Sequence, residues 1–208
     1  MASANKIHMG EVPPGGSVPD HILDLYEMYD WRNAVHVLAG AHPKEWCDVL
    51  DILGSFRLRK SYIRAADRGK AKISKAIDWA FNAQGWQEHE FTTTFALNGK
   101  RLSSGTHKID CLSGLVGLKV EWNSKDQTFG RVLDDFGVLF DLQVLDVGII
   151  VTRTDDLQGL FNAVGIGSKY GASTSPMGKL LPRLSSGGSA GCPVLVFGLT
   201  QRAYDPNS

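Results

Sequence analysis

The sequence contains no apolar run near the roughly 20 residues that a helix needs to span a bilayer. Residues 1–20, MASANKIHMGEVPPGGSVPD, lack the apolar core of a secretory signal peptide. These absences argue against a membrane partner and against secretion, and we expect a cytoplasmic protein. The proline and glycine content of the same stretch predicts a flexible N-terminal arm over residues 1–16, followed by a single domain over residues 17–208.

Cysteine is scarce as well. The chain has three cysteines, Cys47, Cys111 and Cys192, which lie far apart in the sequence. No two of them have the spacing of a zinc site or of a redox pair, and each has apolar neighbours. We therefore expect reduced cysteines that serve as packing residues.

An excess of charge of either sign is also missing, because the formal net charge is zero. The charges are nevertheless segregated: residues 55–75 contain eight Lys or Arg and one acid, whereas residues 157–204 contain no Asp or Glu. Such segregation can build a positive face on a neutral molecule and favours a nucleic-acid partner. For residues 55–75 alone, an ordinary solvated helix face is an equally good explanation.

The hydrophobic residues follow a helical period in some parts of the chain and alternate as in a strand in others. The helical period predicts helices over residues 17–31, 42–56, 71–86, 126–143 and 154–164. Ser17 and Thr154 are the expected N-caps of the first and last of these, and Gly54 and Gly85 are expected to end the second and third. Alternation predicts strands over residues 91–97, 107–112, 115–122, 144–152 and 192–200, with a hairpin turn at Asn98-Gly99.

The strand–helix–strand order over residues 115–152 predicts a βαβ unit, which belongs to a sheet covered on both faces. The expected fold class is therefore α/β, a mixed β-sheet flanked by helices on both faces. Residues 165–191 are predicted to form a long loop. This loop is rich in hydroxyls, glycines and cations, a composition that suits contacts with phosphates and base edges.

Polar side chains with catalytic potential occur in HKIDCLSGLVGLKVEWN, residues 107–123. Since residues two apart on a strand share a face, Lys119, Glu121 and Asn123 are expected to project together, with Asp110 close by on the neighbouring strand. Carboxylates from adjacent strands can hold Mg2+ beside a phosphate, and a lysine can orient the attacking water. Taken alone, the pattern is equally typical of an exposed strand face with mixed charges.

The sequence resembles type II restriction endonucleases of the BglII/BstYI group, within the PD-(D/E)xK nuclease superfamily. The resemblance extends from about residue 29 to residue 204 and is most specific in THKIDCLSGLVGLKVEWNSKDQTF, residues 106–129. VGIIVT, KYGASTSPMGKL and GCPVLVFGLT extend it. It implies a restriction-endonuclease-like core and a bacterial, cytoplasmic enzyme that cleaves palindromic double-stranded DNA as a homodimer with Mg2+. It also implies a functional pairing with a DNA methyltransferase of the same specificity.

In this family an Asp on the first strand and the first acid of E-x-E or E-x-Q on the second bind the metal. Asp110 matches the first acid, Glu121 matches the second member of E-x-E, and Lys119 stands where the first member is expected. The resemblance thus implies a metal-binding carboxylate replaced by an ammonium, which predicts loss of activity. Two alternatives stay open: Lys119 and Glu121 have exchanged roles, or Glu121 is the first acid and Asn123 takes the following role.

Relatives often add an acid from the helical side, for which Glu90 or Glu88 is the candidate here, although both are equally typical of solvated residues. The loop is expected to supply base recognition, and relatives that read a GATC core make such a site the best guess. The expected DNA-binding residues are Lys125, Lys169, Tyr170, Ser173, Thr174, Ser175 and Lys179.

Three classes of function remain. The first is a type II restriction endonuclease, inactivated at Lys119 or not, and the second is a binding-only protein of the same fold that has lost catalysis. The third is a metabolic α/β enzyme, which would need a small-molecule pocket motif. The sequence contains no such motif, and its segregated basic stretches argue against this class.

Overall fold

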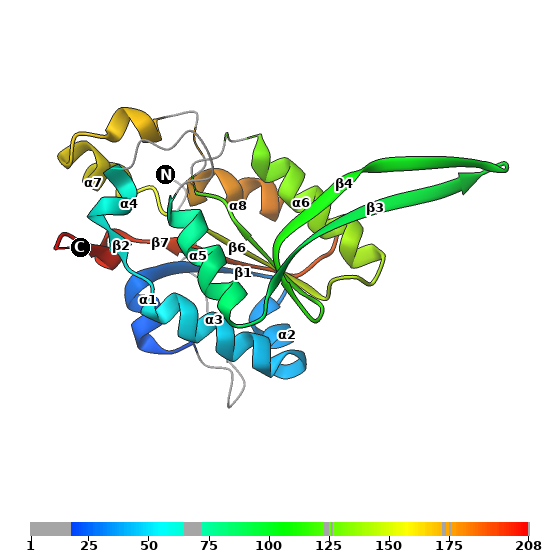
Figure 1. The fold of residues 1–208 in the computed structure, drawn as a ribbon, viewed down its shortest axis with the longest axis horizontal. Helices are drawn as coiled ribbons and strands as arrows, with labels where there is room; N and C mark the ends of the chain where they lie inside the picture. The colour runs from blue at the N-terminus through cyan, green and yellow to red at the C-terminus, as the bar shows by residue number, and fades with distance from the viewer. Residues whose placement is uncertain are drawn as a thin grey trace.

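A six-stranded mixed sheet forms the centre of the computed structural model, which describes residues 18–64, 72–122, 125, 127–171, 174 and 176–207. The strands lie in the order β1-β7-β6-β5-β4-β3 (Figure 1). Parallel pairing joins β5 to β6 and β6 to β7, and the other neighbours are antiparallel. The strand bounds are β1 Tyr26–Trp31, β3 Gln87–Leu97, β4 Lys100–Ser113, β5 Val116–Val120, β6 Val147–Arg153 and β7 Val194–Leu199. A second, two-stranded sheet pairs β2 (Leu58–Arg59) with β8 (Tyr204–Asp205).

Helices cover both faces of the large sheet, as expected from the sequence (Figure 1). One face packs against α1, α2, α3, α5 and α7, and the other packs against α6 and α8. The helix bounds are α1 Asp20–Leu25, α2 Ala34–Ala41, α3 Pro43–Ser55, α4 Lys60–Arg64, α5 Lys72–Ala83, α6 Thr128–Asp141, α7 Leu157–Ala163 and α8 Met177–Ser185. In the described ranges, no helix is both long enough and apolar enough to cross a membrane.

The predicted βαβ unit is confirmed, because β5, α6 and β6 follow one another and the two strands pair in parallel. Every residue of β5, β6 and β7 is buried, as expected for strands covered on both faces. Within β6, Ile149 and Val151 pack on the α3 and α5 side, whereas Ile150 packs on the α6 and α8 side. The unit therefore fixes which side chains of β5 face α6.

The prediction of one helix over residues 17–31 is wrong. Helix α1 ends at Leu25, and the chain continues as β1, which pairs antiparallel with β7. Tyr26 and Met28 are buried while Glu27 is exposed, which is the period of a strand, and the Tyr26 hydroxyl donates to the Leu53 carbonyl at 3.1 Å. The expected cap Ser17 lies outside the described residues.

The prediction of one long loop over residues 165–191 is also wrong. The segment contains a 3-10 turn over Gly167–Tyr170 and the helix α8, which buries Met177, Leu180 and Leu184 against α6 and the sheet. Thr154 does not cap α7, because this helix begins at Leu157 with Asp156 as its N-cap and no side-chain cap bond. The Thr154 hydroxyl instead donates to the Leu199 carbonyl at 2.9 Å. The short helix α2 was not predicted.

Strands β3 and β4 form a long hairpin whose far end extends beyond the body of the molecule (Figure 1). The predicted turn is confirmed: Asn98 and Gly99 have φ values of 51° and 77°, which match the left-handed pair of a type I′ turn. Near the body, Gln87 pairs with Leu112 and His89 with Ile109, so β4 spans three residue steps where β3 spans two. This bulge includes Asp110.

All three cysteines are free thiols, as predicted. Cys111 and Cys192 are buried, and burial raises the pKa of the Cys192 thiol to about 12. Cys47 is exposed on α3, so its assignment as a packing residue is wrong. The helix period explains this, since the buried side of α3 is formed by its neighbour Trp46 and by Val49 and Leu53.

Candidate active site

The strands β4 and β5 pair over only a short distance and then separate. Their register runs from Ser113 and Val116 to Cys111 and Leu118. Beyond that point, the carboxylate of Asp110 accepts the backbone N–H of Val120 at 3.2 Å, in place of a ladder bond. Asp110 also lies in the bulge of β4 opposite β3. A β-bulge changes the direction of side chains and is common beside active sites. We call this separation, bounded by Lys108, Asp110, Lys119 and Glu121, the fork.

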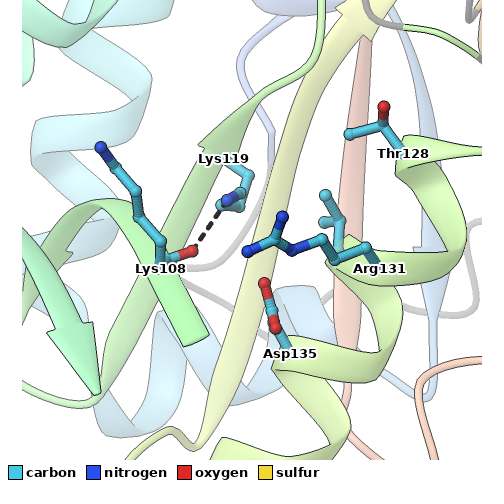
Figure 2. A pocket seen from close by; sticks show the side chains of 6 residues that line it. Lys108, Lys119, Thr128, Arg131 and Asp135 are labelled. Atoms are coloured by element: carbon cyan, nitrogen blue, oxygen red, sulfur yellow. Dashed lines mark hydrogen bonds between the residues drawn. The ribbon is translucent and has the colours of Figure 1, made fainter. Parts of the chain in front are cut away.

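Lys119 lies inside the fork. The residue is 8% exposed, and its ammonium donates to the backbone carbonyl of Lys108 at 2.7 Å (Figure 2). The two strands are thus bridged twice where they part, once by Asp110 and once by Lys119. The close approach of Asp110 to the β5 strand, expected from the sequence, is confirmed.

Glu121 follows β5 directly, and its backbone N–H donates to the Val151 carbonyl at 2.9 Å. Glu121 is 5% exposed and Asp110 is 9% exposed. Two buried carboxylates on adjacent strands are an uncommon arrangement, because burial of charge is costly without compensation. Trp122 and Val120 point to the opposite side, into the core, as predicted.

A cavity of about 160 Å³ lies beside the fork, between β4, β5 and the N-terminal half of α6. Figure 2 shows the guanidinium of Arg131 extending from α6 toward Lys119, with the Asp135 carboxylate next to it. His107 Nδ1 lies 2.8 Å from Asp135 Oδ1. The lining residues are Lys108, Lys119, Thr128, Arg131, Val132 and Asp135.

The side chains contributed by α6 were missed in the sequence analysis. Thr128, Arg131 and Asp135 lie at helical spacing, so a single face of α6 carries all three. The βαβ connection, which was predicted, places one face of α6 against the β5 side chains. Together, the βαβ connection and the helical spacing on α6 would have predicted Arg131 as a site residue.

The metal expected from the resemblance does not fit the residues present. Within the described ranges, no three His, Cys, Asp or Glu side chains are arranged to hold a metal ion. The buried ammonium of Lys119 bonds inside the fork that Asp110 and Glu121 border, and an ammonium offers no lone pair to a cation. Glu90 is exposed on β3 opposite Lys108, and Glu88 forms an ion pair with Lys108 at 2.7 Å.

Tyr170, Thr174 and Pro176, which we call the recognition segment after the role expected from the sequence, are tied to the end of β6. Arg153 is buried, and its guanidinium donates to the Thr174 hydroxyl at 2.7 Å and to the Tyr170 carbonyl at 3.3 Å. It also lies over the rings of Phe161 and Tyr170, at 5.6 and 5.7 Å from their centroids. Burial lowers the pKa of Arg153 and raises the pKa of Tyr170.

The recognition segment also touches the chain that leaves the fork. Lys125 and Thr174 form an antiparallel bridge, which connects the segment after Glu121 to the recognition segment. The structure thus brings the predicted residues Lys125, Tyr170 and Thr174 together, and Arg153, which holds two of them, was not predicted. The sequence signal was a lone arginine at the end of a buried apolar run.

The other predicted site residues are distributed as follows. Lys169 is exposed, with its ammonium 5.7 Å from the Tyr170 ring centroid, and Lys179 is half-buried on α8. Asn123, Ser173 and Ser175 lie outside the described residues.

Comparison with models of protein families gives a match that covers most of the chain. The family model described as restriction endonuclease BglII/BglIII matches residues 26–199, which include every strand of the large sheet, the fork and the recognition segment. A search of curated protein sequences finds no match. The chain therefore belongs to the BglII/BglIII family of restriction endonucleases.

Proposed function

We propose that this chain has the scaffold of a type II restriction endonuclease, which binds a palindromic double-stranded DNA site as a homodimer, and that Lys119 suppresses its Mg2+-dependent cleavage. Membership of the family supports DNA cleavage as the ancestral activity. The observation that carries the proposal is the Lys119 ammonium, buried in the fork and bonded to the Lys108 carbonyl at 2.7 Å.

Lys119 would suppress cleavage electrostatically. A unit charge about 4 Å from a divalent cation raises the energy by several kcal/mol even at an effective dielectric constant of about 20. The lysine also removes one carboxylate ligand. Since about 1.4 kcal/mol corresponds to a tenfold change in an affinity or a rate, cleavage should fall by orders of magnitude.

The residues that remain have defined tasks in DNA binding. The cations of the recognition segment and its surroundings, Lys125, Lys169 and Lys179, suit contacts with phosphates, and the Thr174 hydroxyl and the neighbouring Ser173 and Ser175 suit base edges. A homodimer presents two such segments related by a two-fold axis, which matches a palindrome. A GATC core is the proposed centre of the site, and a methyltransferase of the same specificity is the proposed functional partner.

The second candidate is a protein that only binds DNA. The same lysine favours it, because specific binding needs the recognition segment but not the metal. A third arrangement, in which Glu121 binds the metal beside Asp110 and Lys119 orients water, predicts full cleavage. These candidates predict different cleavage. A nuclease suppressed by Lys119 cleaves only when Glu replaces Lys119, a binding-only protein cleaves in neither form, and the third arrangement cleaves with Lys119 in place.

The binding half of the proposal is tested by selection from a pool of random DNA duplexes at moderate salt, followed by sedimentation of the complex. We expect a single palindromic sequence to be enriched and two chains to be bound per duplex. Enrichment of no sequence, or a single chain bound to an asymmetric site, would contradict it.

A further inference from the structure

The Lys119 ammonium is a buried cation in the fork that the buried carboxylates of Asp110 and Glu121 also border. It makes one hydrogen bond, to the Lys108 carbonyl, and among the described residues no carboxylate forms an ion pair with it. An ammonium has three N–H donors, so two remain for other partners. A buried charge that is not compensated costs several kcal/mol, and an anion beside it relieves that cost.

A second cation extends into the same cavity. Arg131 donates to the Thr106 carbonyl at 3.4 Å, a long bond, and in the described part of the chain it forms no ion pair. Figure 2 shows its guanidinium directed toward Lys119. A guanidinium presents its N–H donors in one plane, side by side, which suits two oxygens of one phosphate.

The other charges among the lining residues leave a positive balance. Asp135 is the only carboxylate among the lining residues, and His107 bonds to it at 2.8 Å. The Lys108 side chain extends away from the cavity, where it pairs with Glu88 (Figure 2). Among the lining residues, one carboxylate thus stands against the charges of Lys119 and Arg131, while the carboxylates of Asp110 and Glu121 border the fork outside this lining.

We infer that this cavity is an oxyanion site, in which Lys119 and Arg131 bind a phosphate group directly where relatives of this chain would place a divalent cation. The cavity of about 160 Å³ is several times the roughly 10–15 Å³ that a cavity needs to hold one water, so a phosphate group has room. The ligand is a DNA phosphodiester, an assignment that rests on the proposed function. Replacement of an acid by Lys119 thus converts a cation site into an anion site and retains a phosphate contact.

The first arm of the test uses inorganic phosphate and the whole chain without DNA. The thermal midpoint is compared in sodium phosphate and in sodium chloride of equal ionic strength, for the wild type and for Lys119→Gln, Arg131→Gln and Lys44→Gln. Lys44 is an exposed cation on α3, across the sheet from the cavity. We expect phosphate to raise the midpoint of the wild type and of Lys44→Gln, and this excess to disappear in the other two variants. An equal excess in all four proteins, or none in the wild type, would overturn the inference.

The second arm measures DNA affinity as a function of salt concentration. The logarithm of the binding constant falls linearly with the logarithm of the salt concentration, and loss of one phosphate contact reduces the magnitude of this slope by about 0.9. We expect this decrease in Arg131→Gln and in Lys119→Gln, by the same amount on specific and on non-specific duplexes, and no change in Lys44→Gln. Unchanged slopes in both cavity variants would overturn the assignment to DNA.

The two arms separate the inference from the proposed function. Phosphate stabilisation that depends on Lys119 and Arg131, in a chain that binds no duplex, supports the oxyanion site and contradicts the DNA function. Specific DNA binding that is insensitive to both variants, with no phosphate stabilisation, supports the DNA function and contradicts the oxyanion site.

Discussion

The guanidinium of Arg153 donates a hydrogen bond to the hydroxyl of Thr174 at 2.7 Å, and this bond joins the last residue of β6 to the recognition segment. Thr174 in turn donates to the Gly171 carbonyl at 2.8 Å and forms a bridge with Lys125. The position of the recognition segment therefore depends on a buried cation in the sheet, and through Lys125 it is connected to the chain that leaves the fork.

Replacement of Thr174 tests this connection. Thr174→Val removes the hydroxyl and leaves Arg153 without its nearest acceptor, which should lower the free energy of unfolding by about 1–3 kcal/mol. Thr174→Ser keeps the hydroxyl and serves as the control. Urea unfolding gives the stabilities, and the ratio of specific to non-specific DNA affinity should fall in the valine variant alone. Equal stability of the valine and serine variants would show that the bond is not needed.

The Asp110 carboxylate bonds to the Val120 backbone, so two substitutions of Asp110 can distinguish a structural role from a catalytic one. Asp110→Asn keeps an oxygen that accepts the Val120 N–H, whereas Asp110→Ala leaves the buried N–H without it. We expect the alanine variant to be less stable than the asparagine variant by about 1–3 kcal/mol in urea unfolding. If the two variants unfold alike, Asp110 does not hold the fork.

Asp30 predicts a dependence of stability on pH. Burial raises the pKa of this carboxyl, which accepts the Val35 N–H at 3.4 Å. The protonated form is thus favoured in the folded state, so this contribution to stability is complete below the unfolded pKa of about 3.9 and is lost as the pH rises through the folded pKa. The unfolding free energy of the wild type minus that of Asp30→Asn should fall as the pH rises above the unfolded pKa of about 3.9, and it should stay constant above the folded pKa. A difference that rises with pH would contradict this.

The cysteines predict a simple pattern of thiol reactivity. Cys47 is exposed, Cys111 and Cys192 are buried, and the pKa of Cys192 is raised to about 12 by burial. Because the thiolate is the reactive form, a thiol reagent at pH 8 should modify one cysteine in the native protein and three in denaturant. Cys47→Ser should abolish the native reaction. Rapid modification of Cys192 in the native state would contradict the burial.

The expectations that held depend on contacts between residues close in sequence. The hairpin turn at Asn98-Gly99 follows from the residues themselves, and the short connection between β4 and β5 brings Asp110 next to the residues around Lys119. The parallel pairing of β5 with β6 follows from the helix between them.

The expectations that failed depend on distant partners. Residues 22–29 fit a helical stripe as well as a strand, and β1 forms because β7, far along the chain, offers a free edge. Arg131 meets Lys119 only after α6 has packed on the sheet, and Arg153 is buried because Phe161 and Tyr170 enclose it. Arg131 could be predicted only by combining the helical spacing of α6 with the βαβ connection, and the spacing of Arg153, Phe161 and Tyr170 does not indicate that they pack together.

The central claim is that Lys119 suppresses metal-dependent cleavage in an otherwise intact nuclease. The most direct measurement incubates the wild type, Lys119→Glu and Lys119→Gln with plasmid DNA that contains GATC-core and other selected sites, in the presence of Mg2+, and looks for discrete fragments. Lys119→Gln removes the ammonium without adding an acid, so it separates relief of repulsion from restoration of a ligand. We expect fragments from Lys119→Glu and none from the wild type. Equal cleavage by the wild type, or none by Lys119→Glu on a site that it binds, would contradict it.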